Sequence, residues 1–596
     1  MRYFVSVCAI SIALCAGVRA EVVVRESFED PSRFSWQKSW GPAKITDERA
    51  QDGKYCLKEE VENEHGLSVY FLEMQAIPGA KYTLTGYVYV PGNQAKKVKP
   101  CLSLNRRDWG ILASATTDKT DEWVPLKVEF QNKSDRFIRI QLYEDGQVAG
   151  QGGAVLYWDN IVLDVEGGVQ PVNQRKGVSP DVIKGLEIKT AGNWQLTVTA
   201  GECEIDGRNV VVAKDQTVAI SPPVEIPVVD EKVILGDAKP ESYNAGTRLQ
   251  FGTIEGIGCH DCIDPTSVVV RSALGGGDVY TEGKDYLLEH VWGGLGRVAD
   301  GRIKAGQPVY VSYTHGLQRV DTIQVGPGGD VQVRQGISNK TTPIPAGADE
   351  YHLALANVYI PYHCKGLTDD QIYPIGEAFR GPGVDWVDAQ RATIPKTLEK
   401  LRKGENVTIV TWGDSVTAGG SASSPEKAFP LLFANTLRGK YPDARIKLIN
   451  AGIGGSSTWG RLKDIQAEVI AFKPDLVTIE FVNDMGMDRD TVFQHYNSAI
   501  DQIRAAGGEV ILITPHFVMP MWMPNFKTGW EPESRATVTF LREFAKQKGI
   551  GLADTSKRWE HLSIEGIPYV TYEYNGINHP DDRGHRMFVD ELMRLF

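Results

Sequence analysis

The chain has 596 residues, of which 42% are hydrophobic, so it can form several globular domains. The formal net charge is −12, from 76 acidic and 64 basic side chains. Since no basic face is evident to match a phosphate backbone, the composition argues against nucleic acid as a partner.

The first 20 residues have the composition of a cleavable signal peptide. Arg2 provides a short positive start, Phe4–Ala16 is an apolar core, and Val18–Ala20 ends in the small residue of a cleavage site. A lipoprotein signal would use Cys15, but the bulky Leu14 precedes it. A membrane anchor is disfavoured because the apolar run is too short to span a bilayer. We therefore expect a secreted or periplasmic protein with no membrane span.

Six cysteines remain after cleavage: Cys56, Cys101, Cys203, Cys259, Cys262 and Cys364. Export permits disulfides, but the sequence does not choose among the pairings. The Cys259–Cys262 motif has no second ligand pair at the spacing of a zinc site. It therefore predicts a local disulfide or two free buried thiols rather than a metal.

Residues 21–168 contain short stretches of alternating hydrophobicity, separated by Gly, Pro and Asn turns. Lys81–Val90 and Phe137–Tyr143 are examples, and the pattern predicts a β-sandwich. With the closing segment Tyr157–Ile161, the order of the motifs resembles jelly-roll carbohydrate-binding modules of galactose-binding-like fold. The resemblance implies a structural calcium held by Glu26 and Asp159, whose oxygens suit that ion. Solvated turn carboxylates are the alternative.

A linker rich in Gly, Pro and polar residues covers Glu166–Asp181, and residues 182–375 are again β-rich. Trp194–Ala200 and Pro308–Tyr313 are two of the strands expected there. This accessory domain, or pair of small domains, shows no catalytic constellation in its sequence. We expect it to act as a spacer or to extend a binding surface.

From residue 388 to the end, strands and helices alternate, which predicts a parallel sheet with helices on both faces. The expected strands are Val407–Trp412, Lys447–Asn450, Leu476–Phe481, Val510–Thr514 and Gly551–Asp554. The expected helices are Ala389–Arg402, Phe429–Gly439, Arg461–Ala471, Thr491–Ala506, Ser534–Lys548 and Arg583–Leu595.

Four polar blocks follow strands or precede the last helix of this region: 413–415, 450–455, 482–484 and 578–580. Acyl transfer needs a nucleophile, a base, and donors aimed at the developing oxyanion. Ser415 can attack, His579 can take its proton, and the N–H groups of Ser415 and Gly455 with the amide of Asn483 can bind the oxyanion. The alternative for Ser415 alone is a helix cap.

These blocks resemble the SGNH (GDSL-type) hydrolases over about residues 400–596. The resemblance implies a three-layer, flavodoxin-like α/β domain with Ser415 as nucleophile and His579 as base. Gly455 and Asn483 would complete the oxyanion hole, and no cofactor would be required for catalysis. The nucleophile elbow of α/β-hydrolases is a poor fit, because its second Gly is missing after Ser415.

Two positions depart from the family pattern. Phe481 replaces the Gly that usually begins the third block, which predicts a narrower pocket. Gly576 occupies the place of the Asp that orients the imidazole, three residues before His579. Asn575 or Asn578 can orient the ring without supplying charge. Asp554, Glu573 or Asp581 is a carboxylate that could replace the Asp, and a Ser–His dyad is the other possibility.

The function expected from this sequence is that of a secreted serine esterase acting on an acylated polysaccharide, with O-acetyl groups as the acyl groups removed. A lipid or small-ester esterase with the same chemistry is the first alternative. A non-catalytic glycan-binding protein with a decayed hydrolase domain is an alternative of another class.

Overall fold

The computed structural model forms two compact units, residues 1–173 and 174–596. It describes residues 21–28, 37–40, 43–61, 68–75, 80–94, 98–106, 110–132, 137–144, 154–166, 179–379, 381–382, 384–524, 526 and 531–596. The predicted signal peptide and most of the predicted linker lie outside these ranges. Within the described residues, no helix is both long enough and apolar enough to cross a membrane.

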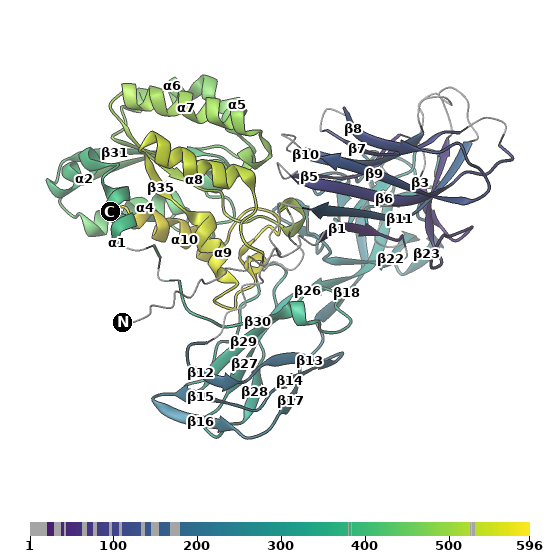
Figure 1. The fold of residues 1–596 in the computed structure, drawn as a ribbon, viewed down its shortest axis with the longest axis horizontal. Helices are drawn as coiled ribbons and strands as arrows, with labels where there is room; N and C mark the ends of the chain where they lie inside the picture. Colours follow the sequence, from purple (N-terminus) through teal and green to yellow (C-terminus); the bar gives the residue numbers. More distant parts are fainter. Residues whose placement is uncertain are drawn as a thin grey trace, which may run out of the picture. The chain divides into compact units, whose positions relative to one another are not determined.

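The first unit consists of two antiparallel sheets (Figure 1), as the alternating pattern predicts. One has the order β3-β4-β11-β6-β9, with β1 also paired to β11, and the other has the order β2-β5-β10-β7-β8. The strands are β1 (Glu21–Glu26), β2 (Gln37–Trp40), β3 (Ala43–Thr46), β4 (Cys56–Val61), β5 (Ser68–Gln75), β6 (Lys81–Tyr89), β7 (Pro100–Asn105), β8 (Ile111–Thr116), β9 (Trp123–Gln131), β10 (Phe137–Glu144) and β11 (Ala154–Glu166).

Strand β6 shows how the sequence specifies these sheets. Tyr82, Leu84, Gly86 and Val88 are buried, while the residues that alternate with them are partly exposed, because successive side chains of a strand point to opposite faces. They join one core with Leu102 and Ile140 from the second sheet. The two sheets are therefore packed on a shared hydrophobic layer, as in a β-sandwich.

The accessory region, residues 182–375, belongs to the second unit and is built of small antiparallel sheets. Its strands are β12 (Val182–Gly185), β13 (Ile188–Gly192), β14 (Gln195–Val198), β15 (Gly201–Ile205), β16 (Arg208–Val212), β17 (Gln216–Ala219), β18 (Val224–Ile234), β19 (Thr247–Arg248), β20 (Thr253–Ile254), β21 (Ile257–Gly258), β22 (Ile263–Ala273), β23 (Gly276–Val279), β24 (Tyr286–Leu288), β25 (Gly294–Arg297), β26 (Pro308–Leu317), β27 (Arg319–Val325), β28 (Val331–Arg334), β29 (Leu353–Ile360) and β30 (Ile372–Pro374). Cys203, Cys259, Cys262 and Cys364 are free thiols, and Cys259 and Cys262 are both buried.

The rest of the second unit is an α/β region with a five-stranded parallel sheet of order β32-β31-β33-β34-β35. Its elements are α1 (Val384–Arg391), α2 (Pro395–Arg402), β31 (Asn406–Gly413), α3 (Ser415–Ala418), α4 (Phe429–Lys440), β32 (Arg445–Gly452), α5 (Thr458–Arg461), α6 (Ile465–Glu468), β33 (Leu476–Glu480), α7 (Arg489–Ala505), β34 (Glu509–Ile513), α8 (Ala536–Lys548), β35 (Gly551–Ala553), α9 (Thr555–Leu562) and α10 (Asp582–Met593). The predicted parallel sheet is thus confirmed.

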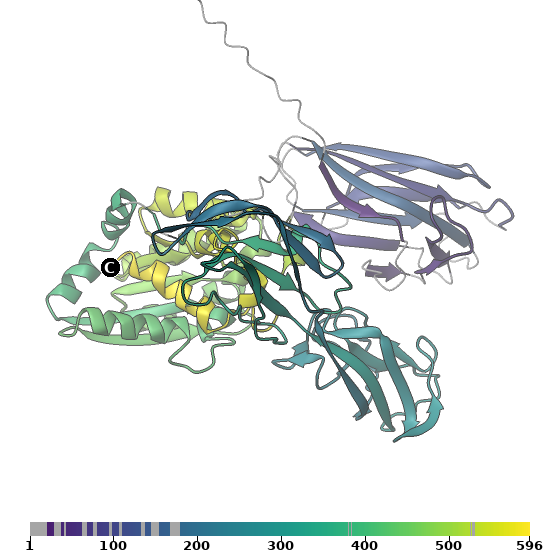
Figure 2. The ribbon, with the colours of Figure 1, turned by 90° about the horizontal axis from the view of Figure 1, so that it is seen from below.

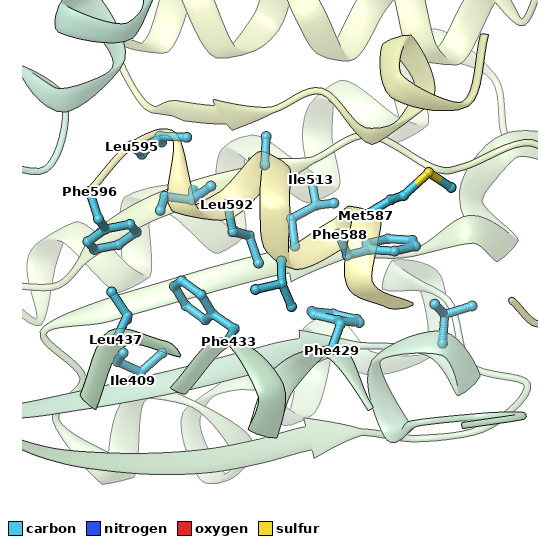
Figure 3. Close-up of a cluster of buried hydrophobic side chains, with 14 of the residues drawn as sticks. Ile409, Phe429, Phe433, Leu437, Ile513, Met587, Phe588, Leu592, Leu595 and Phe596 are labelled. Atoms are coloured by element: carbon cyan, nitrogen blue, oxygen red, sulfur yellow. The ribbon is translucent and has the colours of Figure 1, made fainter. Parts of the chain in front are cut away.

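Helices cover both faces of this sheet (Figures 1 and 2). On one face, Ile409 and Ile513 of the strands pack against α2, α4, α9 and α10. On the other face, Val410 and Leu512 pack against α6, α7 and α8. Figure 3 shows the first layer, where the ring of Phe429 stacks on that of Phe588 at a centroid distance of 5.0 Å. The one-residue offset between the two apolar sets is what a fully buried strand requires.

Two helix predictions need correction. The predicted helix Ala389–Arg402 is divided into α1 and α2, because Pro395 takes the first position of a new helix and cannot donate to the preceding turn. The predicted helix Arg461–Ala471 is a series of short turns from α5 to residue 472. There the side chain of Arg461 turns inward and donates to the carbonyl oxygens of Gly413 and Ala451 instead of lying along a helix surface.

Candidate active site

The first three blocks meet because three neighbouring strands end at the same level. Gly413 at the end of β31 pairs with Gly452 at the end of β32 and with Glu480 at the end of β33. The loops after these strands carry Ser415, Gly455 and Asn483, so the parallel register brings all three to one edge of the sheet. A Cβ placed on Gly454 would lie 3.9 Å from the Cβ of Ser415, which puts the second block beside the first.

Ser415 begins the short helix α3, directly after the buried Asp414. Asp414 is the N-cap: its Oδ1 accepts a hydrogen bond of 3.1 Å from the N–H of Val416. The capping function that Ser415 alone might have served therefore belongs to Asp414, and Ser415 remains partly exposed. Its hydroxyl forms no hydrogen bond with His579 within the described part of the chain, a looseness common before substrate binds.

Asn483 is fixed from both its backbone and its side chain. Its N–H donates to Oδ2 of Asp414 at 3.0 Å, and its Nδ2 donates to the carbonyl oxygen of Ser456 at 2.9 Å. An amide nitrogen carries two hydrogens, so one N–H of Asn483 is left for an oxyanion. Gly455 has φ +71°, a conformation that glycine adopts without strain.

Arg461 holds the loop that carries Gly455, a role that the sequence pattern did not reveal. Its Nη1 donates to the carbonyl oxygen of Gly413 and to the Ser456 hydroxyl, both at 3.1 Å. Its Nε and Nη2 bind Glu468, and the guanidinium is almost fully buried. The planar fork thus ties the end of β31 to the loop after β32.

His579 is presented by a turn that Asn575 organises. Oδ1 of Asn575 accepts hydrogen bonds of 2.9 Å from the N–H groups of Ile577, Asn578 and His579. Asn575 therefore shapes the backbone rather than orienting the imidazole ring. Gly576, inside this turn, has φ +69°.

The ring of His579 lies against Gly420, close to Ser415. The N–H of Gly420 donates to the carbonyl oxygen of Ser415 at 2.8 Å. A Cβ on Gly420 would lie 3.0 Å from Nδ1 and Cε1 of His579 and 2.9 Å from that carbonyl oxygen. The absence of a side chain at this position lets the imidazole approach the start of α3.

Residues 411–587 match the sequence model of the GDSL-like lipase/acylhydrolase family. These residues form a GDSL-like domain. A comparison with the curated proteins finds no match.

Three solved structures are among those similar to the chain. A two-domain esterase active on acetylated mannans is 20% identical with a TM-score of 0.30, and the match covers 34% of this chain and 54% of that one, about half its length. An acetylxylan esterase from Geobacillus stearothermophilus is 20% identical with a TM-score of 0.27 over 32% and 93% of the two chains. The CBM22-1 xylan-binding domain from Paenibacillus barcinonensis is 18% identical with a TM-score of 0.22 over 26% and 100%.

None of the three carboxylates considered from the sequence hydrogen-bonds to His579 in the GDSL-like domain. Asp554 caps α9 and pairs with Arg542 at 2.8 Å. Asp581 caps α10 and pairs with Arg583 at 2.7 Å. Glu573 is buried, and burial raises the pKa of its carboxyl well above the ordinary range, which favours the neutral form.

The group that does contact His579 comes from the accessory region. Oε2 of Glu255 lies 3.3 Å from Nδ1 of His579, and the Ser421 hydroxyl donates to the same oxygen at 2.6 Å. Burial raises the pKa of Glu255, but the hydrogen bonds from His579 and Ser421 outweigh it, and the net pKa lies below the ordinary value. In the sequence, Glu255 is visible only as a charged residue before a glycine, which is a weak signal.

Three buried acids lie beneath the Ser415 edge. Burial raises the pKa of Asp414 to about 6 and that of Asp484 to about 7, and it raises the pKa of Glu480 well above its ordinary value. Glu480 accepts a hydrogen bond of 2.8 Å from Thr417, and Asp484 accepts one of 3.0 Å from the N–H of Thr458. These carboxyls brace the loops of the GDSL-like domain.

Phe481 does not narrow the site. Its ring is fully buried and meets the ring of Trp412 edge-on at 4.8 Å within the core below the sheet. The predicted restriction of the pocket is therefore wrong, because the residue at the end of the strand points into the layer of helices.

The predicted calcium site in the first unit remains a prediction. Asp159 is buried, and its carboxylate accepts hydrogen bonds from the N–H groups of Gln51, Asp52 and Asn160. The side chain of Glu26 lies outside the described residues. Among the side chains that the structure does describe, no group of three or more His, Cys, Asp or Glu residues is placed to hold a metal ion.

Proposed function

We propose that the chain is an exported serine esterase that removes O-acetyl groups from a polysaccharide. The observation that supports this best is the convergence of the four blocks: three follow adjacent strand ends, and the fourth brings the His579 ring against Gly420 beside Ser415. The GDSL-like domain supplies the reaction class, ester hydrolysis. The signal-peptide composition of the first 20 residues motivates export. The resemblance of residues 21–168 to carbohydrate-binding modules motivates a glycan substrate.

In this mechanism the hydroxyl of Ser415 attacks the acyl carbon while Nε2 of His579 takes its proton. The carbonyl oxygen becomes an oxyanion facing the N–H groups of Ser415 and Gly455 and the free N–H of Asn483. His579 then returns the proton to the departing sugar oxygen, which leaves an acyl group on Ser415. A water molecule, deprotonated by His579, releases the acid and restores the serine.

The test begins with covalent labelling of Ser415 by a fluorophosphonate, with the Ser415→Ala protein as the blank. We expect the wild type to be labelled and the variant to lose several orders of magnitude in kcat, because the groups of such a site act as a unit. A wild-type protein that is neither labelled nor faster than Ser415→Ala on any ester would instead be a glycan-binding protein.

Substrate class is tested by comparing acetate release from acetylated glycans with hydrolysis of p-nitrophenyl esters of increasing chain length. We expect the acetylated glycan and the shortest ester to be preferred. A rise in kcat/KM with chain length would favour the lipid esterase alternative.

A further inference from the structure

We propose that Glu255, on the β20–β21 hairpin of the accessory region, is the carboxylate that positions His579 for catalysis. The inference rests on the proposed esterase function and extends it, because one member of the catalytic centre then comes from outside the GDSL-like domain. Glu255 is a positioning residue: it touches the base and not the substrate.

The geometry suits this role. With a proton on Nδ1, His579 donates to Oε2 of Glu255 across 3.3 Å and leaves Nε2 unprotonated. Nε2 forms no hydrogen bond with any described residue, so it is available to Ser415. When Ser415 attacks, its O–H bond breaks and an N–H bond forms at Nε2, while the proton on Nδ1 stays in place. The carboxylate of Glu255 then faces an imidazolium and stabilises it without taking up a proton.

The charge of Glu255 is maintained by its surroundings. The Ser421 hydroxyl donates to Oε2 at 2.6 Å, so the oxygen that faces His579 has two donors. The Glu255 side chain is one-third exposed and that of His579 is one-fifth exposed, so the pair is partly shielded from water. A carboxylate that accepts two hydrogen bonds is favoured in its ionised form, in agreement with the lowered pKa.

The backbone at Glu255 is held in an unfavourable conformation. Glu255 and Gly256 are the two central residues of a hairpin turn between the paired Ile254 and Ile257, with φ of +49° and +79°. Both angles are positive, as a type I′ turn requires, and Asn, Asp or Gly is the usual choice at the first of these positions. A glutamate there has a steric cost, and such costs concentrate at functional sites. Ser421, its partner, also has a positive φ, +64°.

The hairpin is anchored rather than free. Nζ of Lys340 donates to the carbonyl oxygen of Thr253 at 3.0 Å, and the guanidinium of Arg248 donates to the carbonyl oxygen of Gly256. The same region also holds the loop of His579: the Thr341 hydroxyl donates to the carbonyl oxygen of Tyr574 at 2.6 Å. Glu255 and His579 are therefore fixed relative to each other from both sides.

A hydrophobic cluster completes this attachment. Trp292 of the accessory region packs with Met519 and Ile577 of the GDSL-like domain, and Ile577 lies two residues before His579. Ile257, at the base of the hairpin, packs against the same cluster. The apolar contacts of Ile577 and the contact between Glu255 and His579 therefore hold the same short loop, the one that carries His579.

The main test is Glu255→Gln in the full-length protein, assayed on p-nitrophenyl acetate. The amide keeps the shape of the side chain but not its charge, so we expect kcat to fall by at least ~10²-fold with KM nearly unchanged. The matched control is Glu282→Gln, in the same region, whose carboxylate lies 2.7 Å from Nε2 of His290. It should keep wild-type kcat.

Two further measurements separate positioning from a structural role. Added formate should restore part of the activity of Glu255→Ala, because it supplies a carboxylate to the space left by the side chain. Ser421→Ala should lower kcat several-fold in the wild type and have no further effect in Glu255→Gln, since the two residues act through one oxygen. The Ser421 comparison stands even if Glu255→Ala does not fold.

Wild-type kcat in Glu255→Gln, or a loss that formate does not restore in a folded Glu255→Ala, would overturn the assignment of Glu255. Neither result would contradict the proposed serine-esterase activity, which fails if the wild type itself resists the fluorophosphonate and hydrolyses esters no faster than Ser415→Ala.

Discussion

The backbone N–H of Asn483 donates a 3.0 Å hydrogen bond to Oδ2 of Asp414, the residue directly before Ser415. The other oxygen of Asp414 caps α3 at Val416. One buried carboxyl therefore sets the spacing between the candidate nucleophile and a candidate oxyanion donor. The carboxyl of Asp414 thus links the first block, which carries Ser415, to the third block, which carries Asn483.

Asn483→Ala removes the side-chain donor and keeps this backbone bond. We expect kcat to fall by ~10²–10³-fold, because the donor acts on the oxyanion and not on the ground-state ester. Steady-state kinetics on p-nitrophenyl acetate measures the effect, with Asn435→Ala on the exposed face of α4 as the control. A change confined to KM would mean that Asn483 only positions substrate.

Gly420→Ala places a methyl group 3.0 Å from the His579 ring and 2.9 Å from the carbonyl oxygen of Ser415. The ring must move away from both Ser415 and Glu255, so we expect kcat to fall by ~10²-fold, as small misplacements of catalytic groups do. Gly439→Ala is the control: no atom lies within 4 Å of its new Cβ, and alanine favours the helix there. Equal kcat in the two variants would contradict the proposed position of the ring.

The amide variants Asp554→Asn, Glu573→Gln and Asp581→Asn should each keep kcat within a few-fold of wild type. Asp554 and Asp581 are engaged by Arg542 and Arg583, and the carboxyl of Glu573 favours its neutral form. Asp554→Asn should still lower the urea midpoint, because it leaves Arg542 without its charged partner. A large loss of kcat in one variant alone would identify that residue, in place of Glu255, as the partner of His579.

Gly576→Asp restores the residue that the family carries at this position. We expect no gain in kcat, because Nδ1 of His579 already faces Glu255, and a loss of stability of about 1–3 kcal/mol from the positive φ. Urea denaturation measures the loss. Gly306→Asp, at φ +75° with open space around it, gives the cost of the backbone alone. A rise in kcat in Gly576→Asp would show that the new carboxylate has displaced Glu255.

Stability should depend on pH through Asp484. Burial raises the pKa of the Asp484 carboxyl to about 7 in the folded protein. In the unfolded chain the same carboxyl loses its proton near the ordinary pKa of about 4. The folded state therefore binds more protons between these values, and the free energy of unfolding should decrease as pH rises from about 4 to 7. In Asp484→Asn this decrease should become smaller, because the amide still accepts from Thr458 but does not titrate.

The measurement is the urea midpoint of both proteins at pH 5 and pH 7.5, with the exposed Asp501→Asn as the control. Asp484→Asn should gain stability over the wild type at the higher pH. Parallel pH profiles for all three proteins would contradict the effect of burial on Asp484.

The features that the sequence predicted are local ones. The strand Val407–Trp412 and the blocks after it could be predicted from a few consecutive residues. An apolar run indicates a buried strand, and the glycine and polar residues directly after it indicate where that strand ends. The break at Pro395 was missed, although it is also a local feature, since a proline cannot continue the preceding helix. Where the prediction failed, at Arg461, a charged side chain that looks solvent-facing satisfies strand-end carbonyls in the interior.

The contact between Glu255 and His579 spans 324 positions, and no periodicity or motif connects them. Its origin lies in two small hairpin strands and in apolar side chains such as Trp292, each of which is also compatible with an ordinary turn or core. In the sequence, the only indication of a missing partner for His579 was Gly576, which occupies the position of the family's Asp. Only the packed structure could indicate what fills it.

The cluster of Trp292, Met519 and Ile577, together with the bond from Thr341 to Tyr574, has a consequence for how this protein can be recombined. A crossover near residue 388 would transfer all four sequence blocks to a new host and leave behind the side chains that hold the fourth block in place. Such a chimaera would match the family and still be a slow enzyme. The smallest exchangeable piece is then the whole of residues 174–596.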